Sequence, residues 1–184
     1  MTDKEIVRTS KFLSLILRHE PERVGLTLDS GGWVSVEELL GAVNRNGIAL
    51  SREQLEHIVV TSDKKRLALS GDGQRIRASQ GHSVAVDLQY EPQSPPELLY
   101  HGTATRFLDS IRQHGLQKMK RHDVHLSLDA KTAVAVGGRH GKPLHLIIRA
   151  GEMHRAGHIF RRSTNGVWLV DYVPANFIEF PSPS

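Results

Sequence analysis

The sequence predicts an α+β fold in two lobes, and three features of its 184 residues support this prediction. In the first half, apolar residues recur at helical spacing, and two serines have the spacing of helix caps. A proline-rich segment follows. In the second half, short apolar strands alternate with helices, an order typical of a compact α+β lobe. We therefore expect one lobe over residues 1–90 and a second over residues 91–184.

The first lobe is expected to begin with three helices. The first of them carries apolar residues at Ile6, Phe12, Leu13, Ile16 and Leu17. Pro21 ends it, because proline lacks the N–H that a helix interior requires. Ser35 with Glu38, and Ser51 with Gln54, have the spacing of a capping box, in which each side chain satisfies a backbone N–H of the other residue. Two further helices should start at these serines.

A hairpin is expected to close the first lobe. Arg66–Leu69 and Arg75–Arg77 read as strands on either side of the turn Gly71–Gly73. A helix, a short strand, two helices and a hairpin form the element order of a winged helix. Residues 82–97 are the expected linker, because their three prolines favour an extended chain.

The second lobe is expected to contain five strands and two helices. The strands are predicted at Leu98–Tyr100, Val124–Leu128, Leu144–Ile148, Val167–Val170 and Phe177–Phe180. One helix runs through Phe107 and Ile111 and is closed by Gly115, and another is capped by Asp129.

The second half of the chain is basic. The whole chain has a formal net charge of +4, but residues 1–96 carry −1 and residues 97–184 carry +5. Eight of the 11 histidines also lie beyond residue 100. A basic lobe favours an anionic ligand, such as a phosphorylated small molecule or a nucleic acid. The aromatic content of 5% argues against binding of single strands by extensive base stacking.

Composition excludes several classes of protein. Cysteine is absent, which rules out a disulfide scaffold, thiol catalysis and cysteine-ligated zinc or iron–sulfur centres. No apolar run approaches the roughly 20 residues of a membrane span. The first ten residues lack the apolar stretch of a signal peptide. We therefore expect a soluble, cytoplasmic monomer that does not bind membranes.

Cationic residues in the first lobe could bind phosphate. Arg18 and His19 end the first helix, where they either complement the helix dipole or form a phosphate clamp beside an acid–base group. Arg66 follows two lysines, and such runs are usually solvated. Strand alternation nevertheless places Arg66 on the face opposite Leu67, so it should project towards a neighbouring surface or cleft.

The second lobe offers two weaker motifs. His101, Gly102 and Thr103 follow a strand, where glycine lets a ligand approach the backbone and the flanking side chains offer hydrogen bonds. A lone histidine at a strand end is, however, more often structural. His122 and His125 could suggest a metal, but no third ligand has a recognisable spacing, so we expect no metal site.

The order of these motifs is more specific than any one of them. The relevant blocks are Ser10–Ser14, Leu17–His19, Ser62–Arg66, Gly81–Ser83, Leu99–Thr103, Arg121–Ser127, Arg139–Gly141 and Asn165–Trp168. Together they closely resemble the RNA 2′-phosphotransferase family of the KptA type, the NAD-dependent tRNA 2′-phosphotransferases. The resemblance spans roughly Ser10 to Phe180. Leu67 departs from the family pattern, in which an aromatic residue is common, and this bears on packing.

The resemblance implies a winged-helix-like RNA- and phosphate-binding lobe and an NAD-binding lobe of ADP-ribosyltransferase type. It implies that the internal 2′-phosphate of an RNA, such as a tRNA in splicing, attacks NAD⁺ and expels nicotinamide. The ADP-ribose 2″-hydroxyl then attacks that phosphate. The products are RNA with a 2′-hydroxyl and ADP-ribose 1″,2″-cyclic phosphate.

The resemblance also assigns site residues, which we expect to meet in a cleft between the lobes. The catalytic group is Arg18, His19, Arg66 and Arg121. The residues expected to bind NAD are His101, Gly102, Thr103, Ser127, His140 and Val167. Arginines stabilise the charge that gathers on phosphate without losing protons, and His19 is the candidate able to exchange a proton near pH 7. Guanidinium groups take the electrostatic role that a metal would otherwise fill.

Two other functions remain open at this stage. An ADP-ribosyltransferase that stops after the first step would cap terminal phosphates of nucleic acid and would use the same NAD pocket. A winged-helix DNA-binding regulator would not consume NAD. Its recognition helix should be basic, whereas the helix from Arg52 also carries Glu53 and Glu56.

Overall fold

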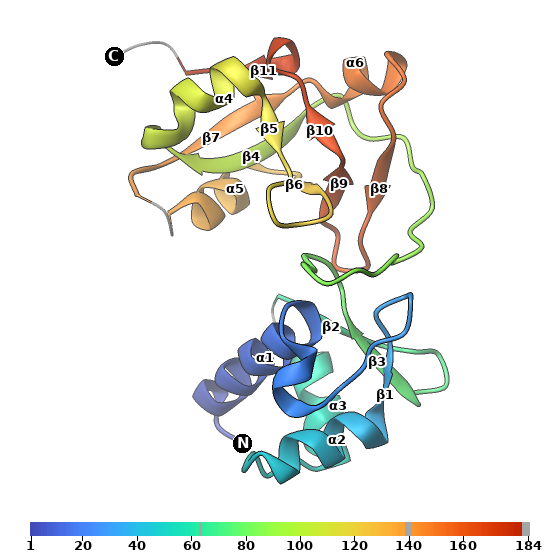
Figure 1. Ribbon diagram of the computed structural model, residues 1–184. Helices are drawn as coiled ribbons and strands as arrows, with labels where there is room; N and C mark the ends of the chain where they lie inside the picture. Colours follow the sequence, from blue (N-terminus) through green and yellow to red (C-terminus); the bar gives the residue numbers. More distant parts are fainter. Residues whose placement is uncertain (63, 139–140, 182–184) are drawn as a thin grey trace. The chain divides into compact units, whose positions relative to one another are not determined.

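The computed structural model describes residues 1–62, 64–138 and 141–181 (Figure 1). The chain divides into two compact units, Met1–Gln89 and Tyr90–Ser184. Each unit combines helices with small antiparallel sheets and has its own hydrophobic core. The predicted α+β class is therefore confirmed. Over the described residues, no helix has both the length and the apolar character needed to span a membrane.

The first unit packs three helices against a three-stranded sheet. The helices are α1 (Asp3–Arg18), α2 (Val36–Arg45) and α3 (Arg52–Thr61), with a 3₁₀ turn η1 (Pro21–Val24). The strands are β1 (Val34–Ser35), β2 (Leu67–Leu69) and β3 (Arg75–Ala78), in the order β1-β3-β2. The core between them contains fully buried side chains such as Leu13, Leu17, Leu39, Leu55, Ile58 and Ile76.

The predicted caps are confirmed at α3 and only half formed at α2. At α3, Ser51 Oγ accepts from the N–H of Gln54, and the Gln54 side chain accepts from the N–H of Ser51. At α2, Ser35 Oγ accepts from the N–H of Glu38 at 2.9 Å. Among the described contacts, Glu38 returns no bond, so the expectation of a reciprocal box is wrong there. Pro21 begins η1, because proline suits a first helical position where no N–H is required.

The chain that follows β3 was expected to be part of a linker, but it is tied to the first unit. The N–H of Asp87 donates to the carbonyl of Ser30 at 2.6 Å. Arg77 Nη1 donates to the carbonyl of Leu88 at 3.0 Å, and its guanidinium lies 4.5 Å from the ring centroid of Trp33. These contacts hold Asp87 and Leu88 against the first unit. The same segment carries Gln80 and Ser83, which contact the end of α1.

The second unit contains three small sheets. Their strands are β4 (Leu99–Ala104), β5 (Leu116–Gln117), β6 (Val124–Leu126), β7 (Pro143–Ile148), β8 (Phe160–Arg162), β9 (Trp168–Val170), β10 (Tyr172–Val173) and β11 (Ile178–Glu179). The sheets have the orders β11-β7-β4, β6-β9-β8 and β10-β5, and every pairing is antiparallel. The helices are α4 (Leu108–His114), α5 (Ala130–Gly137) and α6 (Ala150–Arg155), with 3₁₀ turns η2 (Thr105–Phe107) and η3 (Ala175–Phe177).

Several of these elements differ from the sequence prediction. Gly115 and Asp129 cap helices as expected, but α6 and β8 were not predicted, nor were the two-residue strands β5 and β10. The strand expected from Phe177 is divided between η3 and β11. Elements this short have too few apolar residues to give a periodic signal.

Helix α5 approaches β4 at close range, as Figure 1 shows for the lower face of that sheet. A Cβ atom added to Gly102 would lie 1.6 Å from the carbonyl oxygen of Ala133. One added to Gly137 would lie 2.5 Å from the carbonyl oxygen of Thr103. The close contact between α5 and β4 therefore requires glycine at both positions. The same contact places Gly102 and Thr103 of β4 beside α5.

Candidate active site

Arg18 and His19 lie where α1 ends. Arg18 is the last residue of the helix, and His19 is its C-cap, with its N–H donating to the carbonyl of Leu15 at 2.9 Å. The Arg18 side chain is half-buried, whereas His19 is exposed. A cationic residue here is stabilised by the negative end of the helix dipole. The position is therefore compatible with a residue that complements the dipole and with a phosphate clamp.

Residues 80–83 contact both Arg18 and His19. The N–H of Ser83 donates to the carbonyl of Arg18 at 2.9 Å, which satisfies one of the carbonyls left unpaired at a helix end. Ser83 Oγ lies 2.9 Å from Nδ1 of His19, and Oε1 of Gln80 lies 3.5 Å from Nη2 of Arg18. The structure therefore brings both candidate side chains of α1 against residues 80–83.

Arg66 is joined to the same segment through its backbone. It is half-buried and directly precedes β2. Its carbonyl accepts from the N–H of Ser79 at 2.9 Å, and the carbonyl of Lys65 accepts from Ser79 Oγ at 2.9 Å. Since Gln80 follows Ser79, one stretch of chain contacts both Arg66 and Arg18. The three candidates of the first unit thus share a common neighbour.

In the second unit, Arg121, His125 and His101 form a cluster. Arg121 lies in the loop between β5 and β6, and its Nη1 is 3.3 Å from Nδ1 of His125. The carbonyl of His125 lies 3.0 Å from Nδ1 of His101 in β4. Burial lowers the pKa of His101, and the positive charge of Arg121 lowers it further against the opposing effect of the hydrogen bond. His101 is therefore a neutral ring beside a cation.

Four of the other residues expected to bind NAD lie in or next to strands β4, β6 and β9. Ser127 exchanges two backbone hydrogen bonds with Tyr100, at 2.7 and 2.9 Å, which places it next to His101. Thr103 is buried in β4, and Val167 is half-buried just before β9. His140 lies outside the described residues. The space beside Gly102 is filled by α5, so its missing side chain is explained by helix packing.

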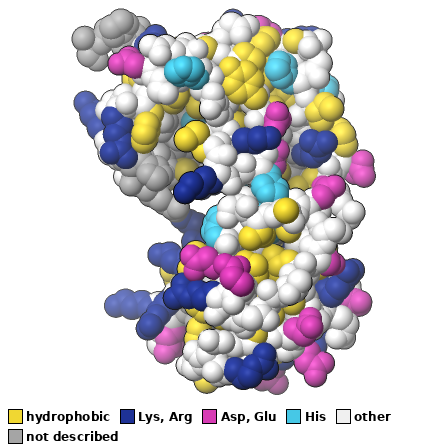
Figure 2. Space-filling model, viewed as in Figure 1, with side chains coloured by type: hydrophobic (Ala, Val, Ile, Leu, Met, Phe, Trp, Pro, Cys, Tyr) yellow, Lys and Arg dark blue, Asp and Glu magenta, His cyan; other side chains and the backbone are white. Residues whose placement is uncertain are grey.

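The loop that carries Arg121 contains a lysine and an aspartate whose pKa values are shifted. Lys118 pairs with Asp171, and this contact raises the pKa of the lysine. Asp123 is desolvated, which raises the pKa of its carboxyl despite nearby Arg161. On the face drawn in Figure 2, Lys and Arg side chains are scattered, and several of them adjoin Asp or Glu side chains. The face in this view therefore carries no broad basic patch.

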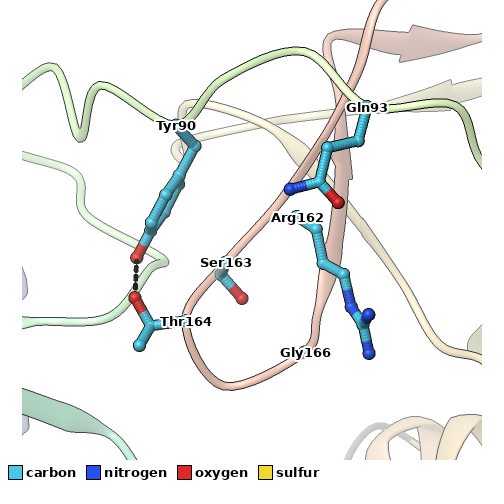
Figure 3. A pocket seen from close by; sticks show the side chains of 6 residues that line it. All are labelled: Tyr90, Gln93, Arg162, Ser163, Thr164 and Gly166. Carbon is cyan, nitrogen blue, oxygen red and sulfur yellow. Dashed lines mark hydrogen bonds between the residues drawn. The ribbon is translucent and has the colours of Figure 1, made fainter.

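A pocket of about 440 Å³ lies beside the hairpin between β8 and β9 (Figure 3). It is lined by Tyr90, Gln93, Arg162, Ser163, Thr164 and Gly166. The hydroxyl of Tyr90 lies 3.2 Å from that of Thr164, which ties residue 90 to the hairpin. The lining contains one cation and no carboxylate, so it suits a polar or anionic group.

Metal ligands do not gather in the part of the chain that is described: no group of three or more histidines or carboxylates is close enough to hold an ion. A different feature does point to a ligand. Trp168 is buried in β9, and within the described residues its indole N–H has no hydrogen-bond partner. A buried donor of this kind costs free energy unless a ligand or water satisfies it. Trp168 directly follows Val167, a residue expected to bind NAD.

Comparison with known proteins decides the family. A sequence model described as "RNA 2'-phosphotransferase, Tpt1 / KptA family" matches residues 4–172. The chain belongs to the RNA 2′-phosphotransferase family. The resemblance drawn from the ordered motifs is thereby confirmed, and so is the prediction of a transferase.

Its relatives match over their full length. A protein of Streptomyces griseus named "Probable RNA 2'-phosphotransferase" is 55% identical over 185 residues, which cover 97% of this chain and 98% of the relative. A protein of the same name from Pseudomonas aeruginosa is 55% identical, with 97% and 99% covered. Another from Rhodopirellula baltica is 54% identical, with 98% of each chain covered.

Sequence reasoning missed several residues that contact the candidate residues or line the pocket. Ser83 belonged to a block of the resemblance, but nothing in the sequence pairs it with His19, which lies 64 positions earlier. Gln80, and the pocket residues Tyr90 and Arg162, carried no motif. Gln80 and Tyr90 lie on irregular stretches and Arg162 ends the three-residue strand β8, so none of them belongs to a periodic pattern.

Proposed function

We propose that this protein is an NAD-dependent RNA 2′-phosphotransferase that removes an internal 2′-phosphate from RNA. The observation that carries the proposal is the family match over residues 4–172, with relatives of that name aligned from end to end. The substrates are an RNA bearing a 2′-phosphate, such as a tRNA in splicing, and NAD⁺. A monomer that needs no metal is part of the same proposal.

The proposed reaction has two steps. An oxygen of the 2′-phosphate attacks C1″ of the nicotinamide ribose, and the bond from C1″ to the nicotinamide nitrogen breaks. The 2″-hydroxyl then attacks phosphorus and gives up its proton, and the bond from phosphorus to the RNA 2′-oxygen breaks. That oxygen takes a proton and becomes a hydroxyl. The phosphate leaves as ADP-ribose 1″,2″-cyclic phosphate.

In this proposal the first unit binds the phosphate and acts as a winged-helix-like lobe. Its order of a helix, a short strand, two helices and a hairpin supports that comparison. Arg18 and Arg66 neutralise the phosphate, because a guanidinium matches two phosphate oxygens and stays charged. His19 accepts the proton of the 2″-hydroxyl and returns one to the leaving RNA oxygen. We assign Arg121 of the second unit to the same phosphate.

The second unit is proposed to bind NAD as an ADP-ribosyltransferase-like lobe. NAD presents ribose hydroxyls, an amide and a pyrophosphate, and the residues present fit such a group. Neutral His101 and the hydroxyls of Thr103 and Ser127 offer uncharged hydrogen-bonding groups, and Trp168 offers a buried donor. Gly102, His140 and Val167 complete the proposed set. Bound NAD supplies the electrophilic ribose carbon.

The DNA-binding alternative is disfavoured by the charges of α3. Arg52 is the cation that could face a groove, but its Nε lies 3.0 Å from Glu56 and its Nη2 donates to the carbonyl of Gly73. A helix whose arginine is paired internally is a poor reader of a negatively charged duplex. The alternative that caps terminal phosphates differs only in its second step.

Incubation with a 2′-phosphorylated oligonucleotide, with and without NAD⁺, tests the proposal. The proposal expects release of nicotinamide and loss of the 2′-phosphate only when NAD⁺ is present. A stable ADP-ribosylated RNA formed by the wild-type enzyme would favour the capping alternative. Salt-sensitive binding of a DNA duplex without NAD⁺ consumption would favour the regulator. His19→Ala should let the ADP-ribosylated RNA accumulate, whereas equal slowing of both steps would reassign the imidazole.

A further inference from the structure

The side chain of Ser83 is placed to hold the His19 ring. Its Oγ lies 2.9 Å from Nδ1 of His19, and its N–H is bonded to the carbonyl of Arg18. The backbone bond ties Ser83 to the last residue of α1, which directly precedes His19, so the hydroxyl is held close to the imidazole. An imidazole has two ring nitrogens, and a partner at one of them selects the tautomer and the nitrogen that faces a substrate.

The chain around Ser83 is fixed by its own contacts. Gly81 has a φ of +82°, a conformation that glycine adopts readily, and it turns the chain towards α1. His82 is only 1% exposed and is packed against Gly32, where an added Cβ would lie 3.3 Å from its Nε2. The serine hydroxyl is therefore presented by an anchored segment.

We infer that Ser83 is a positioning residue for His19, which holds Nδ1 and directs Nε2 to the proton transfers of the proposed function. A hydroxyl suits this task because it both donates and accepts, so it can hold Nδ1 whether or not that atom carries a proton. A carboxylate in its place would stabilise the charged ring. Ser83 thus orients the imidazole in each protonation state that an acid–base group passes through.

Three variants test this inference, which rests on the role proposed for His19. Ser83→Ala removes the hydroxyl and should lower kcat by about 10- to 100-fold, as expected for a misplaced catalytic group. KM for RNA should change by less than about twofold, because the substrate contacts are retained. Ser83→Thr keeps the hydroxyl and should restore kcat to within about threefold of wild type.

Ser94→Ala is the matched control. Ser94 Oγ lies 3.3 Å from Nε2 of His154, so this variant also removes an exposed serine–histidine hydrogen bond, but one that lies in the other unit. It should leave kcat unchanged. Equal losses of kcat in Ser83→Ala and Ser94→Ala would overturn the inference. A wild-type kcat in Ser83→Ala would also overturn it if His19→Ala is inactive.

A spectroscopic measurement separates this inference from the proposed function. ¹⁵N signals of the His19 ring report its tautomer, and they should move towards the mixture found in solution in Ser83→Ala but not in Ser83→Thr. Unmoved signals in Ser83→Ala would refute the positioning role whatever the activity. Full activity of His19→Ala would instead refute the catalytic role proposed for the imidazole.

Discussion

Nδ1 of His101 lies 3.0 Å from the carbonyl oxygen of His125, and this contact fixes the tautomer of a ring inside the second unit. A carbonyl oxygen only accepts, so Nδ1 carries the proton and Nε2 is left as an acceptor. Burial lowers the pKa of the same ring, and Arg121 acts in the same direction. His101 is thus suited to accept a hydrogen bond from a ribose hydroxyl or an amide.

The lowered pKa of His101 predicts a pH-dependent stability. The folded protein holds this ring neutral, so near the ordinary histidine pKa of about 6.5 the unfolded chain binds more protons than the folded one. Stability contributed by the neutral ring is present above that pH and is lost as the pH falls through it. The free energy of unfolding should fall more steeply with acidification in wild type than in His101→Gln, by up to about 1.4 kcal/mol per pH unit. Parallel slopes in denaturant titrations would contradict this.

Gly102→Ala should strongly destabilise the second unit. The added Cβ would meet the carbonyl oxygen of Ala133 at 1.6 Å, and backbone atoms cannot yield cheaply. We expect a loss of about 3 kcal/mol or more in the free energy of unfolding. Gly138→Ala, at the C-cap of α5, is the control, because its Cβ would make only ordinary contacts of 3.6 Å or more. Equal stability of the two variants would exclude the close contact between α5 and β4.

The sequence could predict the α+β class and most of the longer elements, since their apolar residues repeat along α1 and β7 and their caps are marked by Ser51 and Asp129. It also marked Arg18, His19 and Arg121 through an ordered set of motifs. It could not predict what Ser83 contacts, because that contact depends on an irregular path. Nor could it predict that α5 packs against Gly102, because no pattern in the sequence pairs these two elements.

Arg77→Lys should loosen the segment that carries Ser83. The guanidinium donates to two carbonyls, of Gly31 at 3.2 Å and Leu88 at 3.0 Å, and lies over Trp33, a combination that an ammonium cannot reproduce. We expect a loss of about 1–2 kcal/mol in stability.

Arg75→Lys is the control for that substitution. Arg75 also lies over Trp33, at 5.4 Å, but its side chain is 54% exposed and its ion pair with Asp29 lies at the surface. Its loss should cost less than about 0.5 kcal/mol. Thermal unfolding of both variants measures the difference, and equal costs would show that the two carbonyl contacts of Arg77 contribute nothing.

Val167→Glu should impair removal of the RNA phosphate while NAD still binds. Val167 is half-buried before β9 and belongs to the set of residues proposed to bind NAD. A carboxylate there would hold the 2″-hydroxyl and repel the phosphate dianion, so we expect turnover to fall by about 100-fold. Val167→Gln introduces a side chain of the same shape as glutamate but without its charge, so its turnover should fall much less. Unchanged turnover in Val167→Glu would refute the electrostatic explanation.

The fate of a radiolabelled 2′-phosphate tests the central claim most directly. An RNA labelled only at that phosphorus is mixed with excess enzyme and NAD⁺, and the products are separated by charge at successive times. The account predicts that the label leaves the RNA and appears in ADP-ribose 1″,2″-cyclic phosphate, with one nicotinamide released for each phosphate removed. Label appearing as inorganic phosphate, or leaving the RNA without NAD⁺, would contradict it.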